Sequence, residues 1–347
     1  MKALVKYAAG PGNMEIRDVP EPSAGPGQIK IQILHAGICG SDLHIYHSDI
    51  AIPVRPPVTT GHEFSGIIAE IGEGVEGFAV GERVVSETAY EYCGSCDYCS
   101  EGYYNLCNNR RTLGYWYNGI FTNYTVVPAG RVHKIPAGVS EISAAMTEPL
   151  ACVCHAIYDL CRIVAGDLVL VSGPGAIGLM AMQVAKAHGA RVVVSGMEQD
   201  KPRLALAQRL GADLVVNIQE ESLEEAVMAR SQGYGADVVL ECSGSAAAID
   251  TGLNLIKKRG WFTQIGLPGK KLEFDVEKVC YKELHFSGSL GSRKSSWRRA
   301  LALQGNGQVS LEPLADVRLP LSEWQEAFRR FEAKDGCKFF LSPEETK

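Results

Sequence analysis

Three glycines follow directly on the apolar run Leu168–Val171, in the order Gly173-x-Gly175-x-x-Gly178. The run predicts a buried strand, and Leu179–His188 after the loop predicts a helix. Glycines at this spacing allow a tight turn, a close approach of the backbone to a ligand, and close packing of helix on strand. The sequence therefore predicts a strand–turn–helix unit whose helix N-terminus offers free N–H groups to an anion.

The alternation of apolar strands and helices continues to about residue 295. It indicates a parallel sheet with helices on both faces, because strands buried on both sides are apolar throughout. Further strands are predicted at Val192–Val194, Asp213–Val216, Asp237–Leu240, Trp261–Ile265 and Leu284–Ser287. Further helices are predicted at Arg203–Leu210, Glu220–Arg230 and Ala246–Lys258. The fold class is therefore α/β, with a doubly wound parallel sheet of the Rossmann type.

The first 150 residues have a different, β-rich pattern. Gln28–Ile33 alternates polar and apolar residues as a half-buried strand does, and Phe64–Ile71 and Glu82–Val85 predict further strands. The tail from Trp297 returns to helix and short strand. We expect two domains, which a length of 347 residues allows.

Cysteines are concentrated in one loop of the β-rich part. Four of the eleven cysteines lie within fifteen residues, namely Cys93, Cys96, Cys99 and Cys107. The N-terminus has no apolar core of signal-peptide length, so metal binding is a better hypothesis for these thiols than disulfides. A short loop with four thiolates is typical of a closed, structural Zn²⁺ site.

A second set of metal-ligand residue types lies on both sides of this loop. Cys39, His62, Glu63 and Glu148 combine a thiolate, an imidazole and two carboxylates, all of which are Zn²⁺ ligands. Two or three protein ligands and a water leave the open position that a catalytic metal needs. We predict an open zinc site here, with Glu63 as a ligand, an alternating ligand or a catalytic neighbour.

Magnitudes explain why a metal suits this set. Zn²⁺ lowers the pKa of a bound water from about 15.7 to about 7, which corresponds to roughly 12 kcal/mol of stabilisation of the oxyanion. A histidine base contributes a factor of about 10²–10⁴, or some 3–5 kcal/mol. Ser41 and His44 follow Cys39 closely and are candidates to carry a proton to solvent.

Taken together, these residues resemble the zinc-containing medium-chain dehydrogenase/reductase family, the alcohol dehydrogenase superfamily. The stretch Gly61-His62-Glu63-x-x-Gly66, followed by Gly72 and Val75, is similar to the zinc signature of that family. The four clustered cysteines match its structural-zinc lobe, and the glycine loop matches its coenzyme loop.

The resemblance implies a GroES-like catalytic domain over residues 1–154, completed by residues 296–347, and a coenzyme domain over residues 155–295. It implies one catalytic and one structural Zn²⁺ per subunit, a nicotinamide coenzyme, a small-molecule substrate bound in a cleft, and homodimers or homotetramers. We also expect coenzyme contacts at Ala176, Ile177 and Gly266.

Within the family, Glu148-Pro149-Leu150 and His155 are most similar to the polyol and threonine dehydrogenases. The resemblance implies oxidation of a secondary alcohol of a polyol, a sugar or a related small molecule, with L-threonine 3-dehydrogenase and diol dehydrogenase as alternatives. The sorbitol enzymes have an arginine after the last sheet strand, where this chain has Ser287–Ser292 and places Arg293 later. This difference argues against sorbitol itself.

The choice of coenzyme depends on the end of the second sheet strand, where NAD-preferring folds carry an acid. Gly196 stands at that position, preceded by Ser195. Lys201 and Arg203 are candidates to hold a 2′-phosphate, whereas Glu198 is a candidate to reach the ribose. We therefore expect NADP(H) to be used at least as well as NAD(H).

Charge and composition exclude some other functions. The net charge of −6 argues against a nucleic-acid partner, which usually requires a basic face. No stretch is long and apolar enough for a membrane span, so we expect no membrane partner and a cytoplasmic location. Two hypotheses stay open: a zinc-free reductase of the same superfamily, and a regulatory protein that binds nucleotide or zinc without turnover.

Overall fold

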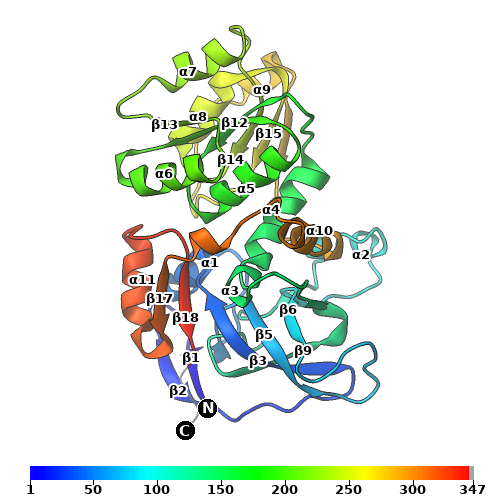
Figure 1. Ribbon diagram of the computed structural model, residues 1–347. Coiled ribbons are helices and arrows are strands. Elements are labelled where there is room, and N and C mark those ends of the chain that lie inside the picture. Colours follow the sequence, from blue (N-terminus) through cyan, green and yellow to red (C-terminus); the bar gives the residue numbers. More distant parts are fainter. Residues whose placement is uncertain (344–347) are drawn as a thin grey trace. The chain divides into compact units, whose positions relative to one another are not determined.

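The computed structural model describes residues 1–343, which form two compact units (Figure 1). Unit 1 holds residues 1–149, residues 292–305 and the chain from residue 314 onward. Unit 2 holds residues 150–291 and 306–313. Helix α4 (Thr147–Leu160) runs through the boundary between the two. Within the described residues, no helix combines the length and the apolarity that crossing a bilayer requires.

Unit 2 is built on a six-stranded sheet in the order β13-β12-β11-β14-β15-β16, and every neighbouring pair is parallel. The strands are β11 (Leu168–Ser172), β12 (Arg191–Gly196), β13 (Leu214–Asn217), β14 (Ala236–Glu241), β15 (Ile256–Gln264) and β16 (His285–Gly288). The helices are α5 (Ala176–Ala187), α6 (Lys201–Arg209), α7 (Leu223–Arg230), α8 (Ala246–Leu255) and α9 (Glu277–Tyr281). The predicted doubly wound parallel sheet is confirmed.

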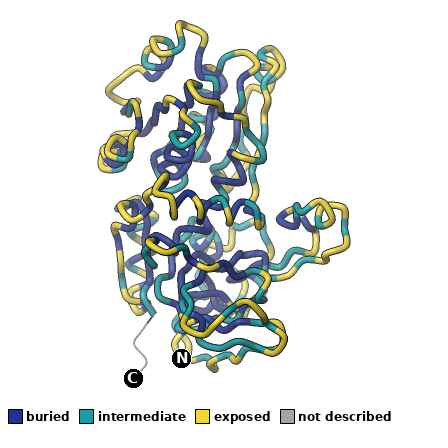
Figure 2. Tube along the Cα trace, turned by 45° about the vertical axis from the view of Figure 1, so that its right-hand side comes forward, coloured by how far each residue is buried: buried dark blue, intermediate teal, exposed yellow. Residues whose placement is uncertain are grey.

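The central strands of this sheet are its most buried part, as Figure 2 shows. All five residues of β11 are buried, which explains why its sequence is apolar rather than alternating. The helix predicted over 246–258 is too long, because α8 ends at Leu255 and β15 begins at Ile256. Ile256 pairs with Ala236 of β14, so sheet pairing overrides the helix propensity of Lys257 and Lys258.

Unit 1 is dominated by β structure. Its largest sheet has the order β10-β6-β5-β3-β18-β17, with β9 also paired to β3, and smaller sheets are formed by β2-β1-β4 and by β7-β8. The strands are β1 (Lys2–Lys6), β2 (Met14–Asp18), β3 (Gln28–Gly37), β4 (Val58–Thr59), β5 (Glu63–Ile71), β6 (Arg83–Ser86), β7 (Ala89–Glu91), β8 (Arg111–Thr112), β9 (Tyr124–Pro128), β10 (Val132–Lys134), β17 (Val317–Pro320) and β18 (Phe339–Ser342).

Five helices and several short 3₁₀ turns complete unit 1. The helices are α1 (Gly40–His47), α2 (Asp97–Ser100), α3 (Glu141–Ala144), α10 (Lys294–Gly305) and α11 (Trp324–Glu332). Strand β18, near the C-terminus, pairs antiparallel with β3, so a C-terminal segment joins the large sheet to which β3 belongs. The core reflects this arrangement, because Trp324, Phe328 and Phe339 pack in one cluster with Ile31 and Phe64.

Candidate active site

The residues of the predicted open zinc site meet where strands β3 and β5 of the large sheet in unit 1 end and begin. Strands β3 and β5 are antiparallel, with Gly37 paired to Glu63. Cys39 lies just beyond the end of β3 and His62 just before the start of β5, so the pairing brings both to the same edge. The ligand atoms of Cys39, His62 and Glu63 all lie within 4.8 Å of one another, and both His62 and Glu63 are buried.

Two glycines make room for this cluster. Gly61 has a φ of +87°, and a Cβ there would lie 2.8 Å from the ring of Phe121. A Cβ on Gly37 would lie 2.9 Å from Glu63 Oε2. Side chains at these positions would therefore displace the backbone before His62 or the Glu63 carboxylate.

The charges of the cluster favour a cation. Burial alone would lower the pKa of His62, but the hydrogen bond with Cys39 and the charges of Asp42 and Glu148 raise it to about 10. Burial would also lower the pKa of Lys338, yet Glu63 and Cys39 raise it. Negative charge around both basic groups therefore outweighs the effect of burial on their pKa values. A thiolate, an imidazole and carboxylates in such a field fit Zn²⁺.

Glu148 is the one predicted ligand that lies outside the group formed by the other three. It lies in the first turn of α4, is 8% exposed, and acts electrostatically on His62. It does not belong to the three-residue group whose donor atoms lie within 4.8 Å of one another. The structure thus brings Cys39, His62 and Glu63 together and leaves Glu148 nearby.

The two predicted relay residues lie three positions apart on α1 and so share one side of that helix. Ser41 Oγ is buried and has no hydrogen-bond partner among the described residues. His44 Nδ1 lies 2.9 Å from Asp49 Oδ1, and both side chains are partly exposed to solvent. Ser41 Oγ is therefore shielded from solvent, whereas the His44 side chain is partly exposed to it. A path that carries a proton from a buried site to water would need this order.

Two further residues of the cluster escaped the sequence analysis. Asp42 is completely buried, accepts a hydrogen bond from the Cys39 backbone N at 2.9 Å, and places Oδ1 3.8 Å from His62 Nδ1. Lys338 forms a fully buried ion pair with Glu63 and donates to the Ile38 carbonyl at 2.8 Å. A carboxylate behind a ligating histidine commonly fixes the orientation of its ring.

Signals for both residues were present in the sequence. Asp42 stands three positions after Cys39, which is the spacing of a helix-capping box, and Cys39 is the N-cap of α1. Lys338 precedes the apolar run Phe339–Leu341, and a lone charge beside a buried strand usually has a partner. The identity of that partner is not visible, because Glu63 lies 275 residues away in the chain.

The four loop cysteines also converge. Their sulfur atoms lie within 4.8 Å of one another, with Cys93 Sγ 3.9 Å from Cys99 Sγ and 3.6 Å from Cys107 Sγ. Zn–S bonds of about 2.3 Å in a tetrahedron place the sulfurs roughly 3.8 Å apart, so the spacing fits the metal. Backbone N–H groups of Ser95 and Cys96 lower the pKa of Cys93 to about 6, which favours the thiolate.

In unit 2 the glycine loop joins β11 to α5. Gly173 has a φ of +94°, and a Cβ on Gly178 would lie 1.9 Å from the Gly173 carbonyl oxygen. Gly175, the N-cap of α5, has open space where its Cβ would be. The first and third glycines are thus required by packing, whereas the second leaves the N-terminus of the helix, at Ala176 and Ile177, accessible to a phosphate.

The end of β12 has the composition that the sequence suggested, but its charges are paired. A Cβ on Gly196 would lie 2.9 Å from Pro174 Cγ, so the position cannot carry a carboxylate without displacing the loop. Arg203 is paired with Asp200. Lys201 lies 2.7 Å from Glu198 and 2.9 Å from Glu220.

The other two predicted coenzyme residues lie at the same edge of the sheet. Ser195 Oγ is buried, 3.5 Å from the Val171 carbonyl oxygen. Gly266 lies two residues after the end of β15, and its N–H donates to the Glu241 carbonyl at 2.9 Å. Both therefore lie at or just after the carboxyl ends of parallel strands, where ligands of such sheets bind.

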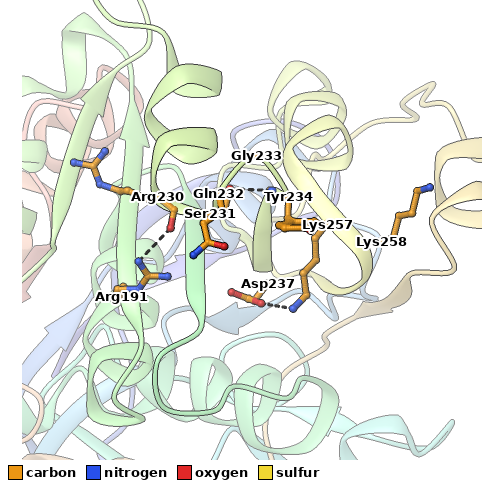
Figure 3. Close-up of a pocket in the computed structure, with 10 residues that line it drawn as sticks. Arg191, Arg230, Ser231, Gln232, Gly233, Tyr234, Asp237, Lys257 and Lys258 are labelled. Carbon is orange, nitrogen blue, oxygen red and sulfur yellow. Dashed lines mark hydrogen bonds and ion pairs between the residues drawn. The ribbon is translucent and has the colours of Figure 1, made fainter.

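A separate cavity of about 800 Å³ in unit 2 does not have the features of a site (Figure 3). It lies where β12, β14 and β15 begin, at the edge opposite the glycine loop. Lys257 is paired with Asp237, and Arg191 donates to the Arg230 carbonyl at 3.1 Å. The side chains of Arg230 and Lys258 point away from each other, so the positive charges do not converge.

Comparisons with known proteins agree with this chemistry. The family models described as "Alcohol dehydrogenase GroES-like domain" and "Zinc-binding dehydrogenase" match residues 25–137 and 176–305. A sorbitol dehydrogenase of Halalkalibacterium halodurans is 45% identical over 99% of both chains, and a D-arabitol-phosphate dehydrogenase of Enterococcus avium is 38% identical over 99% of both. The crystal structure of a zinc-binding dehydrogenase from Sinorhizobium meliloti, bound to NADP, is similar with a TM-score of 0.89, 33% identity and 99% coverage of both chains.

The matched segments contain both candidate metal sites of unit 1, the group of Cys39, His62 and Glu63 and the group of four cysteines. They also contain the helix that follows the glycine loop of unit 2. The relatives span the chain from end to end, so the likeness is not confined to one domain. The chain belongs to the zinc-dependent medium-chain alcohol dehydrogenase family, in the branch of the polyol and threonine dehydrogenases, and is an NAD(P)-dependent dehydrogenase.

Proposed function

We propose that the protein oxidises a secondary alcohol of a polyol, a sugar or a related small molecule to the ketone, with transfer of a hydride to NAD(P)⁺ and release of a proton. The observation that carries this proposal is the group of Cys39, His62 and Glu63, whose ligand atoms lie within 4.8 Å of one another. A sorbitol and an arabitol-phosphate dehydrogenase among the relatives support a polyol substrate.

Cys39 and His62, with Glu63 or Glu148, would hold the catalytic Zn²⁺, which when bound acts as a Lewis acid toward the substrate hydroxyl. Asp42 accepts a hydrogen bond from the backbone N of Cys39, and its Oδ1 lies 3.8 Å from His62 Nδ1, so its charge attracts the His62 ring without a hydrogen bond to it. The carboxylate of Glu63 stays paired with Lys338 until it is drawn toward a cation.

We propose that Ser41 takes up the proton of the hydroxyl and that His44 delivers it to water. Ser41 Oγ has a free hydrogen-bonding capacity in a buried position, and His44 reaches solvent one helical turn later. The second Zn²⁺ would be held by Cys93, Cys96, Cys99 and Cys107, whose four thiolates leave no position for a substrate.

For the coenzyme we propose NADP(H) at least as readily as NAD(H), bound at Gly173, Gly175 and Gly178. The absence of a side chain at Gly196 supports this choice, because it removes the carboxylate that would repel a 2′-phosphate. A 2′-phosphate would compete with Asp200 for Arg203, so the preference is expected to be moderate.

At the level of domains, we propose that residues 1–154 and 296–347 form the catalytic part and residues 155–295 the coenzyme-binding part. We also propose a homodimer or homotetramer that includes the edge strand β16, and a cytoplasmic location, since the thiolates of both metal sites need a reducing compartment.

The test is a screen of NAD(P)⁺ reduction across polyols, sugars, L-threonine and vicinal diols, combined with metal analysis. We expect turnover of at least one polyol or sugar, two Zn²⁺ per chain, and loss of activity when the Zn²⁺ at Cys39 and His62 is removed. Two Zn²⁺ without reduction of either coenzyme by any of these alcohols would refute the proposed activity. Comparison of kcat/KM with both coenzymes tests the preference, and a strong bias toward NAD⁺ would contradict it.

A further inference from the structure

We propose that the substrate carries a phosphate ester, which Arg55 and Arg111 bind beside the ring of Trp116. This inference rests on the dehydrogenase function proposed above and narrows its substrate class to phosphorylated polyols.

Two guanidinium groups lie over one indole ring. The guanidinium carbon of Arg111 lies 4.3 Å from the centroid of the Trp116 ring, and that of Arg55 lies 5.5 Å from the same centroid. Stacking on an aromatic face holds a guanidinium in place while its N–H donors stay available. The pair therefore places two guanidinium groups against one ring of unit 1, with that of Arg111 closer than that of Arg55.

Neither guanidinium group has a carboxylate of the described residues within ion-pair distance, although Glu91 lies opposite Arg111 in the pairing of β7 with β8. Within residues 1–343, neither Arg55 nor Arg111 forms an ion pair, and the Arg111 side chain donates only to the Arg110 carbonyl, at 3.2 Å. Two other arginines stacked on rings have carboxylate partners, since Arg17 lies 2.7 Å from Glu15 and Arg330 lies 2.8 Å from Asp335, whereas Arg131, stacked on Tyr92, has no ion-pair partner among the described residues. The guanidinium groups of Arg55 and Arg111 are therefore available to an anion.

The doublet is anchored to the same turn that supplies a wall of the open metal site. Tyr115 is 4% exposed, and its ring centroid lies 5.5 Å from that of His62. The backbone N of Arg55 donates to the Tyr115 carbonyl at 2.8 Å, and the backbone N of Trp116 donates to Thr112, the residue after Arg111, at 2.9 Å. Trp116 itself directly follows Tyr115, so the cations lie next to the residue that contacts the ligand His62.

The chemistry of the doublet favours phosphate over a neutral hydroxyl chain. A guanidinium offers a planar fork of donors that matches two phosphate oxygens, and such charge-assisted bonds are strong. A phosphate monoester carries a charge between about −1.5 and −2 at neutral pH, which two arginines balance. A neutral polyol would gain little from two cations, since its hydroxyl groups are equally well solvated by water.

The experiment compares sorbitol with sorbitol 6-phosphate, and arabitol with its phosphate esters, as substrates of the zinc-loaded enzyme. We expect kcat/KM for a phosphate ester to exceed that for the free polyol by about 10- to 100-fold, and the excess to shrink at high ionic strength. R111A and R55A should remove this excess and leave oxidation of the free polyol within about threefold. R17A is the matched control, since Arg17 also stacks on a ring of unit 1, and it should change neither rate.

A second readout does not depend on turnover. Binding of the ester should change the tryptophan fluorescence of the wild type, the change should be absent in W116F, and R111K should restore part of the affinity that R111A loses. An ester that binds and reacts no better than its free polyol would overturn the inference, whether or not the variants fold. A loss of both rates in equal measure in R111A and R55A would also overturn it, because that is the effect of a purely structural role.

The two proposals fail in different ways. Oxidation of free polyols without preference for the ester leaves the dehydrogenase function intact and removes only the phosphate site. Absence of turnover with every alcohol refutes the dehydrogenase function, and the fluorescence titration with the ester then decides the phosphate site alone.

Discussion

At the scale of single residues, the ion pair between Lys338 and Glu63 is the feature with the clearest consequence. Both side chains are almost completely buried, at 4% and 1% exposure. Buried pairs contribute little net stability, but removal of one partner leaves an uncompensated charge and costs about 3–5 kcal/mol. Glu63 differs from an ordinary buried carboxylate, because a metal ion bound with Cys39 and His62 would offer it a second positive partner.

The first prediction concerns K338M. The metal-free variant is expected to lose about 3–5 kcal/mol of stability, and the zinc-loaded variant distinctly less, because Glu63 can then be neutralised by the metal. Urea unfolding of both forms measures the difference. K338R, which keeps the charge, should behave like the wild type. An equal loss with and without zinc would mean that Glu63 cannot approach the metal.

The second prediction concerns D42N. Loss of the carboxylate beside His62 should weaken binding of Zn²⁺ at Cys39 and His62 by about 10- to 100-fold, because a carboxylate next to a ligating histidine strengthens its binding to a metal. Competition with a chelator measures the affinity. D49N is the control, since Asp49 bonds His44 on the outer side of the same helix. If both variants bind zinc as the wild type does, Asp42 has no role in orienting His62.

Short motifs in the sequence named the residues of the open site more readily than its distant contacts. Cys39, His62, Glu63 and Glu148 were predicted as one zinc site, and the structure places the ligand atoms of the first three within 4.8 Å of one another and leaves Glu148 outside that group. Lys338 was missed because its partner is distant in sequence, and only the pairing of β18 with β3 brings the two segments side by side.

At the scale of elements, the cysteine loop is tied to the rest of unit 1 by a buried carboxylate. Glu87 accepts from the hydroxyl of Tyr104, which lies in the loop, and its Oε1 lies 2.8 Å from His133 Nε2. The His133 ring stacks on Trp297 of α10, with centroids 5.7 Å apart. The loop contributes only a short helix and a 3₁₀ turn of its own, so its order depends on the metal and on this contact.

The third prediction is that C96S costs stability rather than chemistry. Loss of one thiolate should release one Zn²⁺ per chain and lower the Tm by roughly 5–10 °C, because several kcal/mol of metal binding no longer order the loop. Metal analysis and thermal unfolding measure these changes, and kcat at a temperature well below the Tm should stay close to that of the wild type. A variant with one Zn²⁺ fewer and the native Tm would contradict the structural role.

Element types followed from the sequence more reliably than element ends. The strands of the parallel sheet were visible as apolar runs because both of their faces are covered. The end of α8 was not visible, since Ile256–Lys258 has no residue that stops a helix, and only pairing with β14 converts it to strand. Tertiary pairing overrides a weak local preference there.

At the scale of the whole molecule, one edge of the unit 2 sheet has exposed apolar side chains beside it. Within the described residues, β16 pairs with β15 alone and so ends the sheet with an unpaired edge. Around this edge lie exposed apolar side chains, namely Leu267, Phe274, Val276, Tyr281, Phe286 and Leu290. Contiguous exposed apolar residues beside an unpaired strand are typical of an interface, because both features are costly in water.

The fourth prediction follows from this surface. Wild-type protein should elute as a dimer or tetramer in size-exclusion chromatography with light scattering, and F286K should shift it toward monomer, because a charge in the centre of the apolar surface cannot be buried unpaired. Y234K is the control, since Tyr234 is 77% exposed on another part of unit 2 and should leave the assembly unchanged. A monomeric wild type, or equal effects of F286K and Y234K, would contradict an interface at β16. If the F286K monomer loses activity, its metal content distinguishes loss of assembly from loss of zinc. Both candidate zinc sites lie in unit 1, so both should remain filled in the monomer.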